Sequence, residues 1–297
     1  MNIFGRIITA MATPFYEDGS LNLEEAAELV KTLVNEGSDS VLVCGTTGES
    51  PVMTEEEQFS LLKAAKAAAG DHPVIMGTGS NNTEISCKKS RKAQEAGADG
   101  ILAVVPYYNK PPQEGLFRHF SAIAESVTIP IILYNIPGRT GINMSDETIL
   151  KLHDRYPHIC ALKDAAGNLD QTGRFAMKAD ICHRNDFSVY SGDDSLTLPM
   201  LSCGSCGVIS VASHIAGNEM KDMINAFFSG DVKKATEIHL RLMPLFKGLF
   251  ETTNPILVKA ALELRGIKAG KPRLPLIEAD SEQREKLAGI MKQLNKI

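Results

Sequence analysis

The chain has 297 residues, of which 31 are Lys or Arg and 36 are Asp or Glu, and its formal net charge at pH 7 is −5. The charged residues are interspersed, so the sequence predicts neither a nucleic-acid surface nor binding to an anionic membrane. No apolar run reaches the roughly 18 residues of a membrane-spanning helix, and no secretion signal is recognisable. A cytoplasmic protein that acts on small molecules is therefore expected.

Short runs of β-branched and apolar residues recur along the chain, and their starts are about 20 to 34 residues apart, which leaves room for one helix and two short loops. We interpret them as eight strands: Ile7–Thr9, Val41–Cys44, Val74–Gly77, Ile101–Val105, Ile131–Asn135, Ile159–Lys163, Ser188–Ser191 and Val208–Val211. Alternating strands and helices with short connections predict parallel pairing, and eight strands can close into a (β/α)8 TIM barrel. A doubly wound open sheet is the alternative.

Two of the predicted helices carry clear start or stop signals. Thr54 and Glu57 form a capping box just before an apolar segment. An earlier helix ends at Gly37, and its apolar stripe consists of Leu23, Ala27, Val30 and Val34.

Beyond residue 211 the sequence shows no further strand pattern. Three helical patterns follow, Asp231–Phe250, Pro255–Leu264 and Ser281–Leu294, with a proline-rich link at residues 271–275. We therefore predict two domains, a catalytic barrel over residues 1–224 and a helical domain over residues 225–297.

Lys163 stands at the carboxyl end of the predicted strand Ile159–Lys163, and TIM barrels carry their active sites at these ends. Burial lowers the pKa of a lysine amine, and a neutral amine near pH 7 is the nucleophile that forms a Schiff base with a carbonyl compound. The structural alternative is an ion pair with Asp164 or with another nearby carboxylate.

Other predicted strand ends carry polar residues as well. The second strand leads into Gly45–Ser50, a loop whose backbone amides and hydroxyls suit a carboxylate, although a simple turn is the alternative. Tyr107, Tyr108 and Tyr134 lie at the ends of the fourth and fifth strands and suit a hydroxyl proton relay. Arg139 lies in a loop framed by glycine and proline. Its planar guanidinium either binds a carboxylate or is a solvated surface group.

The seventh strand ends at Gly192, a residue type that permits close approach of a ligand to the backbone. No histidine pair or carboxylate cluster has the spacing of a metal site, so neither a metal nor a cofactor is expected. Cys203 and Cys206 have the spacing of a redox or zinc motif, but no second pair accompanies them. We interpret these two cysteines as small buried residues.

Motifs spread over the whole chain resemble those of one enzyme family. In order they are Thr13-Pro14-Phe15, GTTGES (45–50), PYYNKP (106–111), YNIPGRTG (134–141), LKDAAGN (162–168), SGDD (191–194), GVISV (207–211) and NPILVK (254–259). The chain resembles the dihydrodipicolinate synthase family, pyruvate-dependent class I aldolases that also include N-acetylneuraminate lyase. The resemblance implies a (β/α)8 barrel with a C-terminal helical domain, usually assembled as a homotetramer of two tight dimers.

The resemblance also implies the reaction, which is the condensation of pyruvate with L-aspartate 4-semialdehyde to 4-hydroxy-tetrahydrodipicolinate in lysine and diaminopimelate biosynthesis. It makes Lys163 the Schiff-base residue and Tyr134 the acid/base beside it. Thr46 would pass protons between Tyr134 and Tyr108, and Tyr108 would reach in from the neighbouring subunit of the tight dimer.

Substrate-binding roles are implied in the same way. Thr47 and its loop amides would hold the pyruvate carboxylate, Arg139 the semialdehyde carboxylate, and Gly192 and Ile209 would line the pocket with backbone groups. Sialic-acid lyases are implied to lack the arginine, so Arg139 favours the semialdehyde. Two alternatives stay open: a lyase of a 2-oxo-3-deoxy sugar acid such as N-acetylneuraminate, and a non-catalytic ligand-binding barrel.

In relatives that lysine inhibits, the resemblance implies an effector cleft at the tight-dimer interface. Three positions keep that pattern here, namely Ser50, Asn81 and Tyr107. Glu55 and Gln58 stand where the sensitive type has histidines, and Ile85 stands where it has the glutamate that pairs with the α-amino group of lysine. We expect weak or absent inhibition by lysine.

Overall fold

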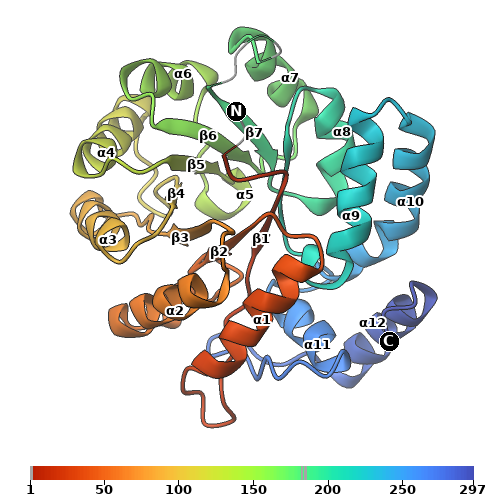
Figure 1. Cartoon of the computed structure of the whole chain (residues 1–297). Coiled ribbons are helices and arrows are strands. Elements are labelled where there is room, and N and C mark those ends of the chain that lie inside the picture. The colour runs from red at the N-terminus through yellow and green to blue at the C-terminus, as the bar shows by residue number, and fades with distance from the viewer. Residues whose placement is uncertain (1–2, 182, 184–185) are drawn as a thin grey trace. The chain divides into compact units, whose positions relative to one another are not determined.

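The computed structural model describes residues 3–181, 183 and 186–297 (Figure 1). Over these residues strands alternate with helices, and eight strands close into a barrel in the order of the sequence. The strand pairs that the structure describes are parallel. The predicted (β/α)8 barrel is confirmed, and the doubly wound open sheet is excluded.

Every predicted strand is present, and its bounds differ from the prediction by at most one residue at either end. The strands are β1 (Ile7–Ala10), β2 (Ser40–Val43), β3 (Val74–Gly77), β4 (Gly100–Val104), β5 (Ile131–Asn135), β6 (Ile159–Asp164), β7 (Ser188–Ser191) and β8 (Gly207–Ser210). Their side chains are almost all buried, which is why the sequence shows continuous apolar runs rather than alternation.

The helices between and after the strands are α1 (Leu23–Asn35), α2 (Glu55–Ala68), α3 (Thr83–Glu95), α4 (Gln113–Ser126), α5 (Pro137–Thr140), α6 (Asp146–Arg155), α7 (Leu169–Lys178), α8 (Thr197–Ser202), α9 (Ser213–Phe228), α10 (Val232–Gly248), α11 (Ile256–Leu264) and α12 (Ser281–Gln293). Two short 3-10 turns, η1 (Ser50–Val52) and η2 (Asp194–Leu196), precede α2 and α8. None of the helices in the described part of the chain is long and apolar enough to cross a membrane.

The chain divides into two compact units. The first unit comprises the chain up to Arg6 together with Ile75–Ile209, and the second comprises Ile7–Val74 together with Ser210–Ile297. In the first unit β4, β5, β6 and β7 are consecutive neighbours in the sheet. Helix α4 packs beside α3 and beside α6 outside these strands (Figure 1).

In the second unit the start of α2 confirms the predicted capping box. The Thr54 hydroxyl accepts from the Glu57 backbone N–H, and the Glu57 carboxylate accepts from the Thr54 N–H.

Gly37 follows α1 with φ +108, and a Cβ there would lie 2.8 Å from the Gly217 backbone. Glycine is therefore required both for the left-handed backbone and for this close approach.

The apolar stripe predicted for α1 is wrong. The buried face consists of Ala26, Leu29, Val30 and Leu33, whereas Leu23 is exposed. The buried face is set by the neighbours of α1, which are α2, α9 and β2. The two stripes share Val30 and overlap in sequence, so periodicity alone did not distinguish them.

The three predicted C-terminal helices are confirmed as α10, α11 and α12. Helix α10 packs against α9 and α12, and α11 packs against α9 and α12 (Figure 1). The boundary at residue 225 between a barrel domain and a helical domain stays a prediction.

Candidate active site

Lys163 and Tyr134 lie side by side in the first unit. They are register partners in the parallel pair of β5 and β6, so their side chains leave the same face of the sheet. The Lys163 Nζ lies 4.3 Å from the centroid of the Tyr134 ring. Each residue is 7% exposed. The local alternation of the two strands thus places an amine and a phenol together at one buried point.

Burial lowers the pKa of Lys163 to about 8. The Asp194 carboxylate acts in the opposite direction and raises this pKa, while the Arg139 guanidinium lowers it further. An ordinary lysine is almost fully charged at neutral pH. Lys163 therefore combines the burial and the weakened basicity that a lysine nucleophile requires.

The ion pair between Lys163 and Asp164 is absent, which removes the simplest structural interpretation of the lysine. The two residues are adjacent in β6 and point to opposite faces of the strand. The Asp164 carboxylate instead accepts hydrogen bonds from the Ala166 N–H at 3.0 Å and from the Thr172 hydroxyl at 2.7 Å. Burial raises the pKa of this carboxyl group, and these two hydrogen bonds lower it.

Burial raises the pKa of Tyr134 to about 12, and Arg139 acts in the opposite direction. The phenol is thus neutral at physiological pH and holds a proton that it can donate. Because both Lys163 and Tyr134 feel the charge of Arg139, these three residues form one electrostatic group.

Arg139 lies in the single turn α5, which starts at Pro137 and is closed by Gly141 with φ +74. The Thr140 hydroxyl lies 3.0 Å from the carbonyl oxygens of both Ile136 and Ile142, so its single proton is shared between them and holds this turn together. The Arg139 side chain itself is exposed. A rigid backbone with a solvated guanidinium can receive a carboxylate without first breaking an internal ion pair.

Gly192 brings its backbone against the lysine. Its N–H donates to the Asp164 carbonyl at 2.7 Å. A Cβ at this position would lie 2.6 Å from Ala165 Cβ and 3.2 Å from Lys163 Cε. Glycine is therefore needed at this position for packing around Lys163. Ile209, in β8, is 2% exposed.

Tyr107 and Tyr108 lie in a tight turn after β4. Tyr108 has φ +71, which is rare for a residue with a side chain, and it is 88% exposed. Asn109 donates through its N–H to the Tyr107 carbonyl and through its amide to the Asn81 carbonyl, both at 2.9 Å. The turn thus presents Tyr108 outward and joins Tyr107 to the segment that carries Asn81.

In the second unit the loop Gly45–Ser50 follows β2. Its turn is closed by the Glu49 N–H, which donates to the Thr46 carbonyl at 3.0 Å. Gly48 is held tightly, since a Cβ there would lie 3.1 Å from the Met11 carbonyl, and its own carbonyl accepts from the Thr13 hydroxyl at 2.7 Å. Thr46 is exposed, and Thr47 is 4% exposed.

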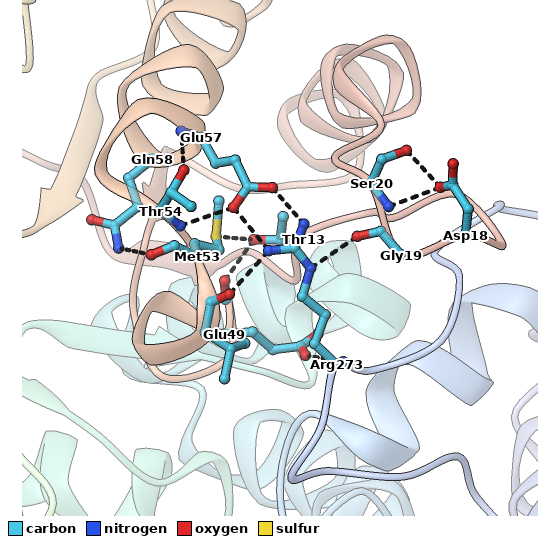
Figure 2. Close-up of polar contacts among 12 residues, drawn as sticks. Thr13, Asp18, Gly19, Ser20, Glu49, Met53, Thr54, Glu57, Gln58 and Arg273 are labelled. Atoms are coloured by element: carbon cyan, nitrogen blue, oxygen red, sulfur yellow. Dashed lines mark hydrogen bonds and ion pairs between the residues drawn. The ribbon is translucent and has the colours of Figure 1, made fainter.

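Glu49 anchors this loop to the C-terminal part of the second unit. Its φ of +54 is left-handed, and its carboxylate is held from two sides. Lys259 Nζ contacts Oε1 at 2.8 Å, and the Arg273 N–H donates to Oε2 at 2.8 Å. The Lys259 and Glu49 side chains are only 2% and 1% exposed. Figure 2 shows Glu49 beside Arg273.

Arg273 extends the same network toward the start of α2. Its guanidinium donates to the carbonyls of Gly19 and Val52 and to the Glu57 carboxylate (Figure 2). Its carbon Cζ also lies 4.2 Å from the centroid of the Phe15 ring. Neither Arg273 nor a role for Lys259 was predicted from the sequence. Lys259 could have been recognised in the sequence, because it is a lysine within the strongly apolar helix Ile256–Leu264.

Among the residues predicted for an effector cleft, Gln58 has a structural role. Its amide donates to the Ser50 carbonyl at 2.8 Å and to the Met53 carbonyl at 3.2 Å, and the side chain is buried. Glu55 is exposed in the first turn of α2. Ser50, Glu55 and Gln58 belong to the second unit, and Asn81 and Tyr107 belong to the first.

Cys203 and Cys206 are free thiols. Burial raises the pKa of Cys206 to about 11, so its reactive thiolate form is scarce near neutral pH. Both side chains are half-buried rather than fully buried as predicted, and the raised pKa supports a packing role for Cys206. The residues that the structure describes contain no group of three or more His, Cys, Asp or Glu arranged to hold a metal ion.

Comparison with known proteins gives a consistent relationship over the whole chain. The Dihydrodipicolinate synthetase family matches residues 3–294. The 4-hydroxy-tetrahydrodipicolinate synthase 1 of Halalkalibacterium halodurans is 54% identical over 97% of this chain and 96% of its own length. The crystal structure of DHDPS from Cyanidioschyzon merolae with lysine bound has a TM-score of 0.96 and 46% identity over 99% of both chains.

A dihydrodipicolinate synthase from Thermotoga maritima has the same TM-score of 0.96 at 39% identity, and the match covers 100% of both chains. Sequence and structure therefore agree over the full length, including the C-terminal helices. This chain belongs to the dihydrodipicolinate synthetase family.

Proposed function

We propose that this chain condenses pyruvate with L-aspartate 4-semialdehyde to give 4-hydroxy-tetrahydrodipicolinate. The observation that carries the proposal is the buried Lys163 amine, whose pKa burial lowers to about 8, beside the Tyr134 ring. At pH 7 a group with this pKa is neutral in roughly a tenth of molecules, against a few in ten thousand for an ordinary lysine. The fraction of neutral, nucleophilic amine is thus much larger than for an ordinary lysine.

The chemistry follows from a neutral amine. Lys163 Nζ attacks the carbonyl carbon of pyruvate, and loss of water leaves an imine. Removal of a methyl proton gives an enamine, whose carbon forms a bond to the aldehyde carbon of the second substrate. The amino group of that substrate then attacks the imine carbon, which closes the ring and releases Lys163. Each step moves protons or exchanges bonds at carbon, and none transfers electrons to a cofactor.

Tyr134 is proposed as the acid/base of these steps. Its pKa of about 12 keeps the phenol protonated, so it can donate to the oxygen that leaves as water. Its ring lies against the reacting Lys163 Nζ, which supports the assignment. Gly192, whose backbone lies against Lys163, and Ile209 are proposed to line the pocket with backbone groups.

Arg139 is proposed to hold the semialdehyde carboxylate. Its charge influences both Lys163 and Tyr134, which supports a location near the reacting atoms. A guanidinium at this point favours a short carboxylated aldehyde over a polyol sugar acid such as N-acetylneuraminate.

Thr46, and Thr47 with the amides of its loop, are proposed to take the roles expected from the sequence, which are proton transfer and binding of the pyruvate carboxylate. We also propose a cytoplasmic homotetramer of two tight dimers in which Tyr108 acts on the site of the neighbouring subunit. The exposure of Tyr108 on a left-handed backbone supports this last role, because a solvated tyrosine in such a conformation has no packing function within its own chain.

Reductive trapping tests the proposal. Borohydride added together with pyruvate should irreversibly inactivate the protein and add the mass of the reduced pyruvate adduct to the peptide that contains Lys163. Borohydride alone is the control and should leave both mass and activity unchanged. Labelling of a different lysine would contradict the assignment of Lys163, and trapping without turnover of the semialdehyde would favour a non-catalytic barrel.

A further inference from the structure

Asn254 contacts one of the residues proposed to bind substrate. It lies just before α11, 207 positions along the chain from Thr47, and its Nδ2 donates to Thr47 Oγ1 at 2.8 Å. Asn254 is 5% exposed and Thr47 is 4% exposed. Both residues belong to the second unit. The reaction described above makes no use of Asn254.

The direction of this hydrogen bond determines what Thr47 can do. A hydroxyl group has a single proton to donate and two lone pairs that accept. Because Asn254 Nδ2 occupies a lone pair of Thr47 Oγ1, the Thr47 proton is directed away from Asn254. That proton is then available to an acceptor, and a substrate carboxylate is a strong one.

The rotated amide is the competing arrangement. Asn254 Oδ1 is buried and has no hydrogen-bond partner among the described residues. Rotation by 180° would not remove this deficiency, since it would replace a buried unpaired carbonyl with a buried unpaired NH2 group. In the rotated form Thr47 would donate to Asn254 and would lose its proton donor toward a substrate.

Asn254 lies in the turn that leads into a firmly packed helix. Helix α11 is buried along most of its length, including Ile256, Leu257 and Val258. The same helix supplies Lys259, whose Nζ lies 2.8 Å from Glu49 in the loop that carries Thr47. The loop is therefore held at two points, by Asn254 in the turn before α11 and by Lys259 within α11, which is how a binding group is kept in a single orientation.

We propose that Asn254 is a positioning residue that directs the Thr47 hydroxyl proton toward the carboxylate of pyruvate. This inference rests on the proposed role of Thr47 as a carboxylate ligand. Asn254 does not touch the substrate in this scheme, and its effect passes entirely through the Thr47 hydroxyl.

The test compares Asn254→Leu and Asn254→Asp with Thr47→Val in the full chain, with kcat/KM measured separately for pyruvate and for the semialdehyde. Asn254→Leu keeps the shape but loses the donor, and we expect kcat/KM for pyruvate to fall about tenfold, as for loss of a buried hydrogen bond. Asn254→Asp should be worse, because a carboxylate accepts the Thr47 proton and turns it away from the substrate. In both variants kcat/KM for the semialdehyde should stay within about twofold of wild type.

A double-mutant cycle separates positioning from structural support. Added to Thr47→Val, Asn254→Leu should cause no further loss for pyruvate, because the hydroxyl through which it acts is gone. The inference is overturned if Asn254→Asp is milder than Asn254→Leu, if the two losses add in full, or if the loss falls equally on both substrates. If Thr47→Val itself leaves kcat/KM for pyruvate unchanged, the proposed role of Thr47 fails and the inference fails with it.

Discussion

Lys163 is a buried amine that is acted on by charges of both signs. Asp194 favours its charged form and Arg139 its neutral form, while burial has the largest effect and lowers the pKa to about 8. The acid next to it in sequence, Asp164, is occupied by Ala166 and Thr172 on the other side of the strand. A contacting carboxylate would have kept the amine charged. Because Asp164 is held on the other side of the strand, burial remains the largest influence on the Lys163 amine and weakens its basicity.

Arg139→Ala should separate the two substrates. Loss of a bidentate, charge-assisted contact costs a few kcal/mol, so kcat/KM for the semialdehyde should fall on the order of 10² or more. Borohydride trapping of pyruvate at Lys163 should survive, because Arg139 is proposed to bind only the second substrate. Arg118→Ala is the control, since Arg118 is 79% exposed and pairs with Glu114 on the same helix. Faster cleavage of N-acetylneuraminate than condensation of the semialdehyde by the wild type would contradict the proposed substrate.

At the scale of elements, a buried ion pair joins helix α11 to the loop Gly45–Ser50. Lys259 is buried against Glu49, and its Nζ also donates to the Lys271 carbonyl at 3.1 Å and lies 4.4 Å from the centroid of the Phe15 ring. Burial lowers the pKa of Lys259, and Glu49 raises it. Two buried charges are tolerated here because each is the partner of the other.

Lys259→Met should strongly destabilise the protein. It leaves the Glu49 carboxylate buried without its ammonium, which typically costs about 3–5 kcal/mol of folding free energy. The double variant Glu49→Gln with Lys259→Met should recover most of that loss, because no unpaired charge remains. Denaturant unfolding measures both changes.

Lys31→Met is the matched control for this experiment. Lys31 contacts Glu28 at 2.7 Å, but the two side chains are 53% and 62% exposed, so the loss should stay below about 1 kcal/mol. If Lys259→Met costs no more than Lys31→Met, the buried pair does not hold the loop.

At the scale of the whole molecule, the residues proposed to act in the reaction occur in both units. Lys163, Tyr134, Tyr108 and Arg139 belong to the first unit, and Thr46 and Thr47 belong to the second. Tyr108 is exposed in its own chain, and its proposed role in catalysis depends on a neighbouring subunit. We therefore expect the activity of this protein to depend on its oligomeric state.

Subunit mixing tests the proposed role of Tyr108. Tyr108→Phe and Lys163→Ala proteins should each be nearly inactive, and mixing them under conditions of subunit exchange should restore activity. One site of the hybrid dimer then has Lys163 from one chain and Tyr108 from the other. Mixing Tyr134→Phe with Lys163→Ala is the control and should restore nothing, because β5 and β6 place both residues in one chain. Failure of the first mixture would show that Tyr108 does not act across subunits.

Inhibition by lysine should be weak, with half-inhibition above about 1 mM, which corresponds to roughly −4 kcal/mol. Ile85 is 54% exposed near the start of α3 and offers no charge to an amino group. Glu84 is adjacent, but on a helix its side chain points about 100° away. Ile85→Glu should tighten inhibition about 10- to 150-fold, the range for a hydrogen bond to a charged group.

The control for this last prediction is Ile85→Gln, which adds polarity without charge and should have a smaller effect. Half-inhibition of the wild type below about 1 mM in a coupled assay would contradict the prediction.

Local features of the sequence were sufficient to predict the strands, the capping box at Thr54 and the position of Lys163 at the end of β6. Each depends on neighbours within a few residues: hydrophobic runs, a cap three residues from its partner, or a charged residue at the end of an apolar strand. The order of these elements, with short connections throughout, was enough to predict a parallel barrel.

Only the tertiary structure decided which side chains meet. In the structure Asp164 contacts Thr172 and not Lys163. The buried face of α1 contains Ala26 and Leu33 and not Leu23. Thr47 is hydrogen-bonded to Asn254, which lies 207 residues away in the sequence. Periodicity does not encode such contacts, because they depend on how distant elements pack. The sequence by itself therefore determined the order and type of the elements and singled out Lys163 as the candidate nucleophile, whereas the surroundings that tune and position this lysine came from packing.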